Sequence, residues 1–196
     1  MNDNKITNIL ICGVGGQGII LASKLLSEAA LNSGFDVKQS EVHGMSQRGG
    51  SVVSYIRFGK KVCSPLIGKN DADFILSFEK MEILRYLDYA GTKTKLIISD
   101  MEISPASVNS GKFSYPGNIE EVMKAKKYDY HLINIMKLAE SSGNPKTVNT
   151  IMLGALSSFL SIDEKIWKQT LTETLPQKIL DINLTAFRIG QNFLIK

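Results

Sequence analysis

The sequence is poor in cysteine, with only Cys12 and Cys63 among its 196 residues. Neither belongs to a Cys-x-x-Cys pair, so the chain lacks the cysteines that a zinc site or an iron–sulfur cluster requires. Cys12 stands inside an apolar run, which is typical of a small buried residue. We therefore expect no metal site in this chain and no cofactor held by this chain alone.

Long apolar runs are also missing. No stretch approaches the about 20 consecutive apolar residues that cross a bilayer as a helix. The first seven residues are polar and lack the apolar core of a secretory signal. We expect a cytoplasmic protein that has no membrane partner.

Neither sign of charge dominates, since 23 basic and 19 acidic residues give a net charge of +4. The densest basic cluster, Lys124, Lys126 and Lys127, lies beside Glu120 and Glu121, as on a solvated helix face. We therefore expect no nucleic-acid partner. With 43% hydrophobic residues, the chain can bury the core of one globular domain, which we place at residues 1–196.

Hydrophobic patterning predicts alternating strands and helices. Short β-branched runs between glycine or polar residues predict strands, and apolar residues at helical spacing predict helices. The expected strands cover residues 6–12, 35–42, 51–58, 72–78, 95–100 and 130–135, and the expected helices cover 17–33, 79–89 and 119–125. Because strand 6–12, helix 17–33 and strand 35–42 form a βαβ unit, we expect these two strands to be parallel.

The last third of the chain follows a helical period. Further helices are expected to begin near Asn144-Pro145, Asp163 and Pro176. The last of them presents an apolar face made of Ile179, Ile182, Ala186, Ile189 and Phe193. The sequence thus predicts an α/β fold with a Rossmann-like, open, mostly parallel sheet, helices on both faces and a helical C-terminal part over residues 145–196.

A glycine turn follows the first expected strand, with the spacing Gly13-x-Gly15-x-x-Gly18. In such turns the first glycine permits the tight turn, the second lets a phosphate approach, and the third lets helix and strand pack closely. The N–H groups that begin the next helix favour an anion. We predict a phosphate-bearing ligand at Gly13, Gly15, Gly16, Gln17 and Gly18; the alternative is a turn that only packs the helix on the sheet.

Two common nucleotide sites fit this turn less well. A Walker A site needs Lys and Ser or Thr where Ile19 and Ile20 stand. A nicotinamide site would use Glu41, which lies near the end of the second expected strand, where a ribose-binding acid belongs. Because no hydride-transfer residues are found, an NAD(P)-dependent dehydrogenase stays an alternative, as does a non-catalytic nucleotide-binding regulator.

The loop 43–50 follows the second expected strand at the edge where open α/β sheets bind ligands. A guanidinium and backbone donors between flexible glycines can bind a phosphate or a carboxylate. The candidate site therefore also includes His43, Ser46, Gln47, Arg48 and Gly49. The alternative is an ordinary surface connection.

Three stretches taken in order carry a resemblance: "GVGGQGIILASKLLSEAA", "SEVHGMSQRGGSVVSYIRFG" and "SPLIGKNDADFILSFEKMEILR". They resemble the gamma-type subunits of 2-oxoacid:ferredoxin oxidoreductases. The variant "EVHGMSQRGGSV" is most similar to the small (beta) subunits of the indolepyruvate branch. The resemblance continues through "NTIMLGALSSFL" and "NLTAFRIG" and so covers nearly the whole chain.

The resemblance implies a function in a complex. These enzymes oxidatively decarboxylate a 2-oxoacid with coenzyme A, giving an acyl-CoA, carbon dioxide and reduced ferredoxin. This chain has no Gly-Asp-Gly thiamine–metal motif and no cluster cysteines. The resemblance therefore implies a large alpha subunit that carries thiamine diphosphate with magnesium and [4Fe-4S] clusters. It also implies that this chain is inactive alone, has no catalytic residue of its own and helps to form the coenzyme A approach.

The 2-oxoacid and the assembly stay open at this point. Aryl pyruvates such as indolepyruvate follow only from the most similar branch, and pyruvate, 2-oxoglutarate and branched-chain 2-oxoacids are alternatives. A large partner requires a broad surface, typically more than about 2,000 Å². We place that surface around Trp167 and Phe187, the alternative being that both are core residues. Isolated chains could pair as a homodimer through the same face.

Overall fold

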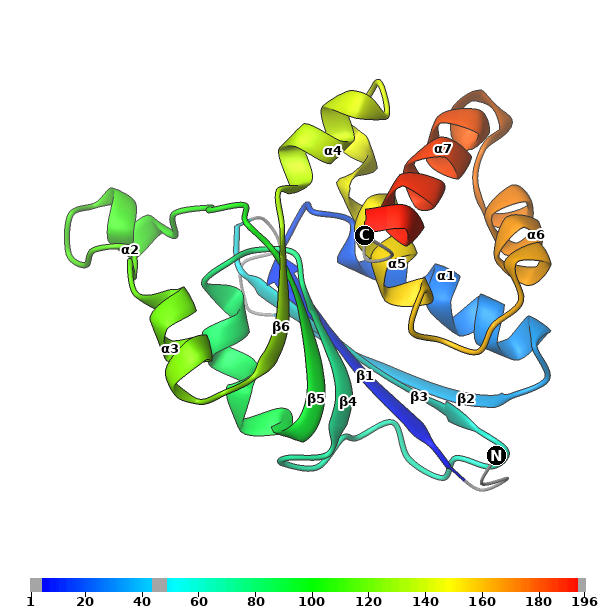
Figure 1. Cartoon of the computed structure of the whole chain (residues 1–196), viewed down its shortest axis with the longest axis horizontal. Coiled ribbons are helices and arrows are strands. Elements are labelled where there is room, and N and C mark those ends of the chain that lie inside the picture. The colour runs from blue at the N-terminus through cyan, green and yellow to red at the C-terminus, as the bar shows by residue number, and fades with distance from the viewer. Residues whose placement is uncertain (1–4, 44–48, 194–196) are drawn as a thin grey trace.

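The computed structural model describes residues 5–43 and 49–193. Its strands form one open sheet in the order β2-β3-β1-β4-β5-β6 (Figure 1). The strands are β1 (Thr7–Val14), β2 (Asp36–His43), β3 (Ser51–Gly59), β4 (Ala72–Ser77), β5 (Ala90–Ser99) and β6 (Asp129–Ile133). All six lie close to the strands that the sequence predicts.

The sheet is mixed rather than purely parallel. Strands β1, β4, β5 and β6 pair in parallel, whereas β3 is antiparallel to both β1 and β2. The predicted open, mostly parallel α/β sheet is confirmed. One detail of the βαβ unit needs correction: β2 runs in the direction of β1 but is not its neighbour. The seven residues 44–50 between β2 and β3 are too few for a parallel crossover, so β3 returns antiparallel between them.

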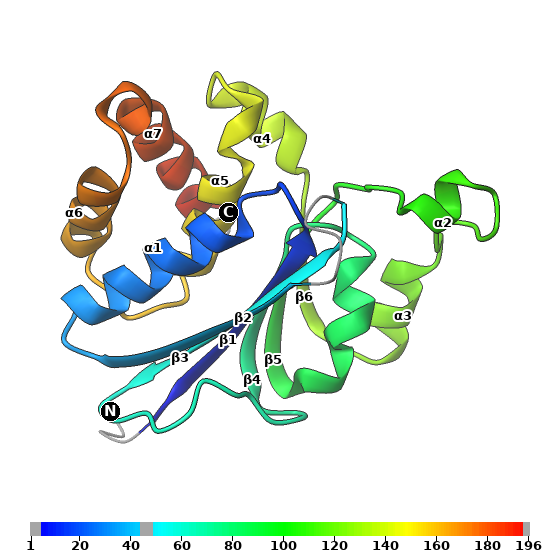
Figure 2. The same ribbon diagram turned by 180° about the vertical axis from the view of Figure 1, so that it is seen from behind.

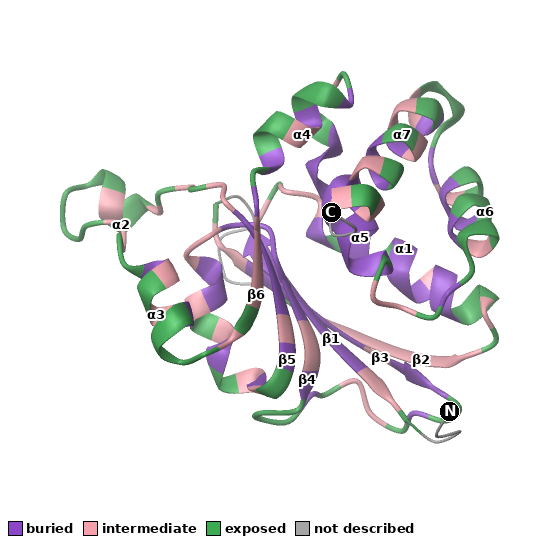
Figure 3. Ribbon diagram, in the orientation of Figure 1, coloured by how far each residue is buried: buried purple, intermediate pink, exposed green. Residues whose placement is uncertain are grey.

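Helices cover both faces of the sheet, as predicted (Figures 1 and 2). One face carries α1 (Ile19–Asn32), α5 (Val148–Ser157), α6 (Glu164–Thr174) and α7 (Gln177–Phe193). The other face carries the 3₁₀ helix η1 (Glu82–Tyr89) and α3 (Ile119–Ala125). The central strand β1 is buried from both sides: Ile9 and Ile11 join the core under α1 and α5, and Leu10 and Cys12 join the core under η1. Figure 3 shows this buried centre.

The sequence did not predict three short helices, which are α2 (Ala106–Asn109), α4 (Ile135–Ser141) and η2 (Pro145–Thr147). The expected strand 130–135 ends at Ile133 instead. Asn134 then caps α4, because its side chain accepts a hydrogen bond from the Lys137 N–H over 3.2 Å. Because Ile133 and Ile135 on either side of Asn134 are both apolar, the sequence predicted one continuous strand where the structure changes from strand to helix.

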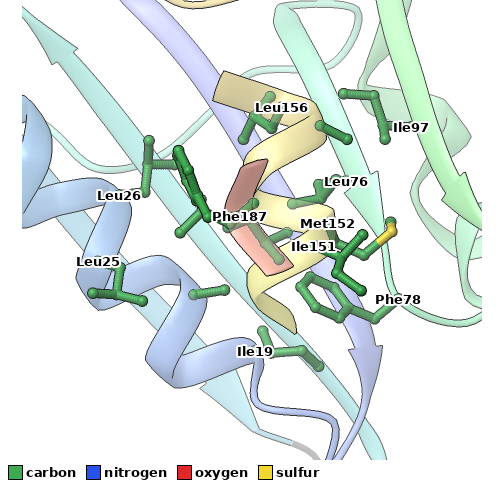
Figure 4. Packing of buried hydrophobic residues seen from close by; sticks show 14 of the residues in the cluster. Ile19, Leu25, Leu26, Leu76, Phe78, Ile97, Ile151, Met152, Leu156 and Phe187 are labelled. Atoms are coloured by element: carbon green, nitrogen blue, oxygen red, sulfur yellow. The ribbon is translucent and has the colours of Figure 1, made fainter. Parts of the chain in front are cut away.

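The contact between α5 and α7 is made backbone to backbone. It lies beside the cluster of buried hydrophobic residues in Figure 4, where Ile151, Met152, Leu156 and Phe187 are labelled. A Cβ atom on Gly190 would lie 2.0 Å from the carbonyl oxygen of Ile151, and one on Gly154 would lie 2.2 Å from that of Phe187. Beside the glycines, the Thr150 hydroxyl donates to the Asn183 side chain over 2.6 Å. The two helices therefore depend on glycine to approach each other.

This contact corrects the predicted apolar face of α7. Of the five residues expected there, only Ala186 is buried; Ile179, Ile182, Ile189 and Phe193 are half-buried. The buried residues are Leu180, Asn183, Ala186, Phe187 and Gly190. The buried face of α7 is rotated from the predicted one because Gly190 and the hydrogen-bonded Asn183 make the contact with α5. Neither residue contributes to a hydrophobic pattern in the sequence.

Trp167 and Phe187 do not form an exposed partner surface. Their side chains are 1% and 3% exposed, and their ring centroids lie 5.2 Å apart in the core between α6 and α7. Of the two readings considered for this pair, the core reading is correct. Cys12 is also fully buried, as predicted.

Candidate functional site

The predicted glycine turn connects the end of β1 at Val14 to the start of α1 at Ile19. Gly16 and Gly18 have φ angles of 104° and 81°, which lie in the left-handed region that favours glycine. The turn also contacts the end of the second predicted loop, because the Gly15 N–H donates to the Gly50 carbonyl oxygen over 2.9 Å. The structure thus brings the turn and the end of this loop together.

The glycines of the turn serve different purposes. A Cβ on Gly13 would lie 2.9 Å from the Cβ of Phe78, and one on Gly18 would lie 2.7 Å from the side-chain nitrogen of Asn149. Both glycines are therefore required by close packing. A Cβ on Gly16 would meet no heavy atom within 4 Å. The backbone at Gly16 is consequently open to a ligand.

The side chain of Gln17 fastens the turn from within. Its Oε1 accepts a hydrogen bond from the Val14 N–H over 2.7 Å. Its Nε2 donates to the Phe78 carbonyl oxygen over 2.7 Å and to the sulfur of Met101 over 3.3 Å. The amide of Gln17 is thus engaged within the protein and holds the turn against β4 and the segment after β5.

We expect Gln17→Leu to lower the free energy of unfolding by about 2 kcal/mol, because it leaves the Val14 N–H and the Phe78 carbonyl unpaired in a half-buried place. Urea denaturation measures this loss. The matched control is Gln169→Leu, since Gln169 lies exposed on α6 and its side chain donates a hydrogen bond to the exposed Glu173. Equal stability of the two variants would contradict the fastening role.

Two hollows open on either side of the turn. One of about 490 Å³ lies beside α1 and is lined by residues that include Gly16, Ile20, Lys24 and Val52. The other, of about 410 Å³, lies between the turn and the start of α5 and includes Gly16, Lys146 and Asn149. Gly16 and Gly18 line both hollows.

The N-terminus of α1 faces these hollows without a cap. Gly18 stands at the N-cap position, no side chain caps the helix there, and its first turn contains no acidic residue. The first N–H groups of a helix have no partner within it, and the helix dipole places partial positive charge there. Lys146 adds positive charge at one hollow, and Lys24, which pairs with Glu28 over 3.6 Å, lines the other. The arrangement can bind an anion.

Of the predicted loop 43–50, the structure describes His43, Gly49 and Gly50. His43 ends β2 opposite Val52, and Gly49 has a φ angle of 76° just before β3. Ser46, Gln47 and Arg48 lie outside the described residues. Glu41, the candidate ribose-binding acid, accepts hydrogen bonds from Gln39 over 2.8 Å and from Ser23 over 3.2 Å.

Two buried carboxylates lie at the same sheet edge, on the η1 face, and were missed in the sequence. Glu82 accepts hydrogen bonds from the Ser51 hydroxyl and, over 2.8 Å, from Arg85. Ser51 begins β3, so Glu82 anchors the end of the loop 43–50. The second buried carboxylate is that of Glu79. The only sign of Glu79 and Glu82 in the sequence is that two acidic residues stand three positions apart in an apolar segment.

Glu79 is fully buried and joins three segments. Its carboxylate accepts hydrogen bonds from the Glu82 N–H over 2.8 Å, the Ile103 N–H over 3.0 Å and the Tyr115 hydroxyl over 2.6 Å. It therefore holds the start of η1 and the irregular segment after β5 in place below the turn.

Three phenols in this region favour the neutral form. Burial raises the pKa of Tyr55 and of Tyr86, and burial together with the hydrogen bond to Glu79 raises the pKa of Tyr115. In the unfolded chain a tyrosine has a pKa of about 10, and its folded-state pKa here is higher. The resulting stabilisation is fully present below about pH 10 and is lost as the pH rises from there toward the folded-state pKa. We expect the free energy of unfolding to fall above about pH 10 and to fall less steeply in Tyr115→Phe. Urea titrations between pH 8 and pH 11 measure the slope, and an unchanged slope would contradict this.

No group of three or more His, Cys, Asp or Glu side chains within residues 5–43 and 49–193 could hold a metal ion. None of the helices in the described part of the chain is long and apolar enough to span a membrane.

Known proteins are similar to this chain over almost its full length. The model of the pyruvate ferredoxin/flavodoxin oxidoreductase family matches residues 8–193. The chain is 40% identical to the indolepyruvate oxidoreductase subunit IorB of Thermococcus kodakarensis and 38% identical to that of Pyrococcus horikoshii, with 95% of each chain covered.

Solved structures share the fold. The gamma subunit of a keto/oxoacid ferredoxin oxidoreductase from Geobacter sulfurreducens has a TM-score of 0.71 at 21% identity, over 97% of this chain and 99% of that one. The 2-oxoglutarate:ferredoxin oxidoreductase of Magnetococcus marinus has a TM-score of 0.74 at 20% identity, over 96% of this chain and 31% of that one. The resemblance noted in the sequence is confirmed: the chain belongs to the pyruvate ferredoxin/flavodoxin oxidoreductase family, and its relatives in that family include indolepyruvate oxidoreductase subunits.

Proposed function

We propose that this chain is the small subunit of an indolepyruvate oxidoreductase and that its glycine turn receives the phosphate part of coenzyme A. The substrate follows from the relatives at 38–40% identity, whose names specify indolepyruvate. The N-terminus of α1, where Gly18 offers no side-chain cap, lies between two hollows, and this observation supports the coenzyme and carries the proposal. The Magnetococcus marinus enzyme of the same fold was solved with coenzyme A bound.

The redox cofactors of the reaction do not fit this chain. Cys12 is fully buried and Cys63 is exposed, and each is a free thiol. Two separated thiols cannot ligate a [4Fe-4S] cluster, which needs four. We therefore assign thiamine diphosphate, magnesium and the clusters to a larger partner subunit, with ferredoxin as the electron acceptor of the complex.

The role of this chain is to bind and orient the anionic end of the coenzyme. The N–H groups at the start of α1 supply preorganised donors, and Gly16 allows close approach of a phosphate. Lys146 supplies charge from one side, and Lys24, which pairs with Glu28, lines the other. Arg48 in the loop 43–50 supplies a guanidinium that can pair with a phosphate through two hydrogen bonds. The chain contributes no acid, base or nucleophile to the chemical step.

Kinetics of the assembled enzyme test this role. We expect Arg48→Ala to raise the KM for coenzyme A by roughly 10- to 150-fold, because a charge-assisted hydrogen bond contributes about 1.5–3 kcal/mol. Lys146→Ala is expected to raise it about threefold, as an exposed charge contributes less. The KM for the 2-oxoacid should stay nearly constant in both variants.

The matched control is Lys165→Ala, which removes an exposed lysine from α6. Equal losses for both substrates, together with a weaker complex, would show that the turn and the loop serve the subunit interface instead. The isolated chain should reduce no viologen dye with indolepyruvate, thiamine diphosphate and coenzyme A. Micromolar binding of NAD(H) by the isolated chain would favour the dehydrogenase alternative.

A further inference from the structure

A third hollow, which we call the aromatic cavity, lies near the N-terminal end of β1, away from the glycine turn. Figure 1 shows this end of β1 beside the chain's N-terminus. The volume of the aromatic cavity is about 350 Å³. Its walls are aromatic and include Phe35, Phe58, Phe74 and Phe159. The rings form two pairs, with centroids 5.3 Å apart for Phe35 and Phe58 and 5.9 Å apart for Phe74 and Phe159.

Lysines surround this aromatic cavity. Lys5, Lys93 and Lys95 line it together with a single acidic residue, Asp73. Asp73 is already neutralised, because it pairs with Lys5 over 3.0 Å and accepts a hydrogen bond from the Asn8 N–H over 2.9 Å. The lining therefore keeps a net positive charge.

The two remaining lysines differ in their environment. Lys95 pairs with Asp129, and its Nζ lies 5.2 Å from the ring centroid of Phe159. Lys93 is exposed and forms no ion pair with any residue in 5–43 or 49–193. Lys93 is therefore available to an incoming anion at the mouth of a pocket whose wall is aromatic.

We propose that this cavity binds a small aromatic carboxylate. Its volume lies in the range of small-molecule sites, and a ring can stack against the phenylalanine pairs while the carboxylate meets Lys93. A phosphate is the poorer occupant, since the cavity offers rings where a phosphate site offers converging backbone N–H groups.

This site is separate from the glycine turn. Strand β1 runs eight residues from Thr7, at the cavity, to Val14, at the turn. At about 3.3 Å per residue, the two sites lie about 25 Å apart. The proposal does not depend on the function proposed above, and coenzyme A and an aromatic carboxylate can bind together.

Calorimetric titration of the full chain tests the proposal with four probes. Phenylacetate and indole-3-acetate carry both a ring and a charge, cyclohexylacetate carries the charge without an aromatic ring, and 2-phenylethanol carries the ring without the charge. We expect both aryl acetates to bind at least fivefold more tightly than either of the other two. Equal affinity of cyclohexylacetate or 2-phenylethanol would overturn the assignment.

Variants locate the binding. Phe159→Leu should weaken phenylacetate binding about tenfold, within the range of an aromatic pair contact, with Phe113→Leu as the control at an exposed ring. Lys93→Gln should weaken it about threefold, with Lys137→Gln as the control. Because Lys93 is exposed, this second variant keeps the test decisive if Phe159→Leu fails to fold.

Two further outcomes would overturn the site. Displacement of phenylacetate by saturating coenzyme A would place the probe at the glycine turn. Loss of binding when the chain is assembled with its partner would show that the cavity is a subunit contact. We expect the chain to bind phenylacetate with the same affinity with and without coenzyme A, and with and without its partner. Lys93→Gln should lower that affinity in each case.

Discussion

Gly190→Ala should destabilise the protein by about 3 kcal/mol, although alanine is the better helix former. On propensity alone the substitution would gain about 1 kcal/mol within a helix. The added methyl would however lie 2.0 Å from the Ile151 carbonyl oxygen and 2.9 Å from the Ala155 nitrogen. These atoms belong to the backbone of α5, so the clash is relieved only by moving one helix away from the other, and the packing loss exceeds the propensity gain.

Equilibrium urea unfolding measures this effect. The control is Thr185→Ala on the exposed side of α7, where a somewhat smaller gain in helix propensity meets no neighbouring helix. That variant should be neutral or slightly stabilised. A Gly190→Ala protein at least as stable as the parent would show that α5 and α7 can separate freely, and would contradict the backbone contact.

Glu79→Ala should cost about 3–5 kcal/mol, the second large effect that we expect. The substitution leaves the Glu82 N–H, the Ile103 N–H and the Tyr115 hydroxyl without their shared acceptor in a fully buried place. Each unpaired buried donor costs about 1–3 kcal/mol. Glu79→Gln should cost less, because its carbonyl oxygen still accepts hydrogen bonds.

The matched control for Glu79 is Glu102→Ala. Glu102 lies on the irregular segment after β5. Its half-exposed side chain forms an ion pair with Lys80 at 3.4 Å, and this is its one ion pair within residues 5–43 and 49–193. Its loss should change the free energy of unfolding by less than about 1 kcal/mol. Equal effects at the two positions would show that the network around Glu79 is dispensable.

Local patterns predicted the features of the site that depend on neighbours in sequence. The glycine turn, the strand before it and the helix after it could be located because their residues follow one another within residues 6–33. The contact of the turn with the loop 43–50 could also be expected, since both follow strands that end at the same edge. In these features the observed fold agrees with the sequence, and the Gly15 N–H contacts the Gly50 carbonyl oxygen.

The remaining features depend on residues that are distant in the sequence. Glu79 meets Tyr115 across 36 positions, and Glu82 meets Ser51 across 31. No local pattern identifies such partners. The buried face of α7 was predicted wrongly for a related reason. Gly190 and Asn183 make the contact, and their contribution to packing becomes visible only when the position of α5 is known.

The insertion of β3 sets the distance between the ends of β1 and β2, beside which we propose that coenzyme A binds. Adjacent strands lie about 4.8 Å apart, so the ends of β1 and β2 stand about 9.6 Å apart with β3 between them. If β2 paired directly with β1, the turn after β1 and the loop after β2 would begin only one strand spacing apart. The single antiparallel strand thus acts as a spacer that separates the residues following β1 from the residues following β2.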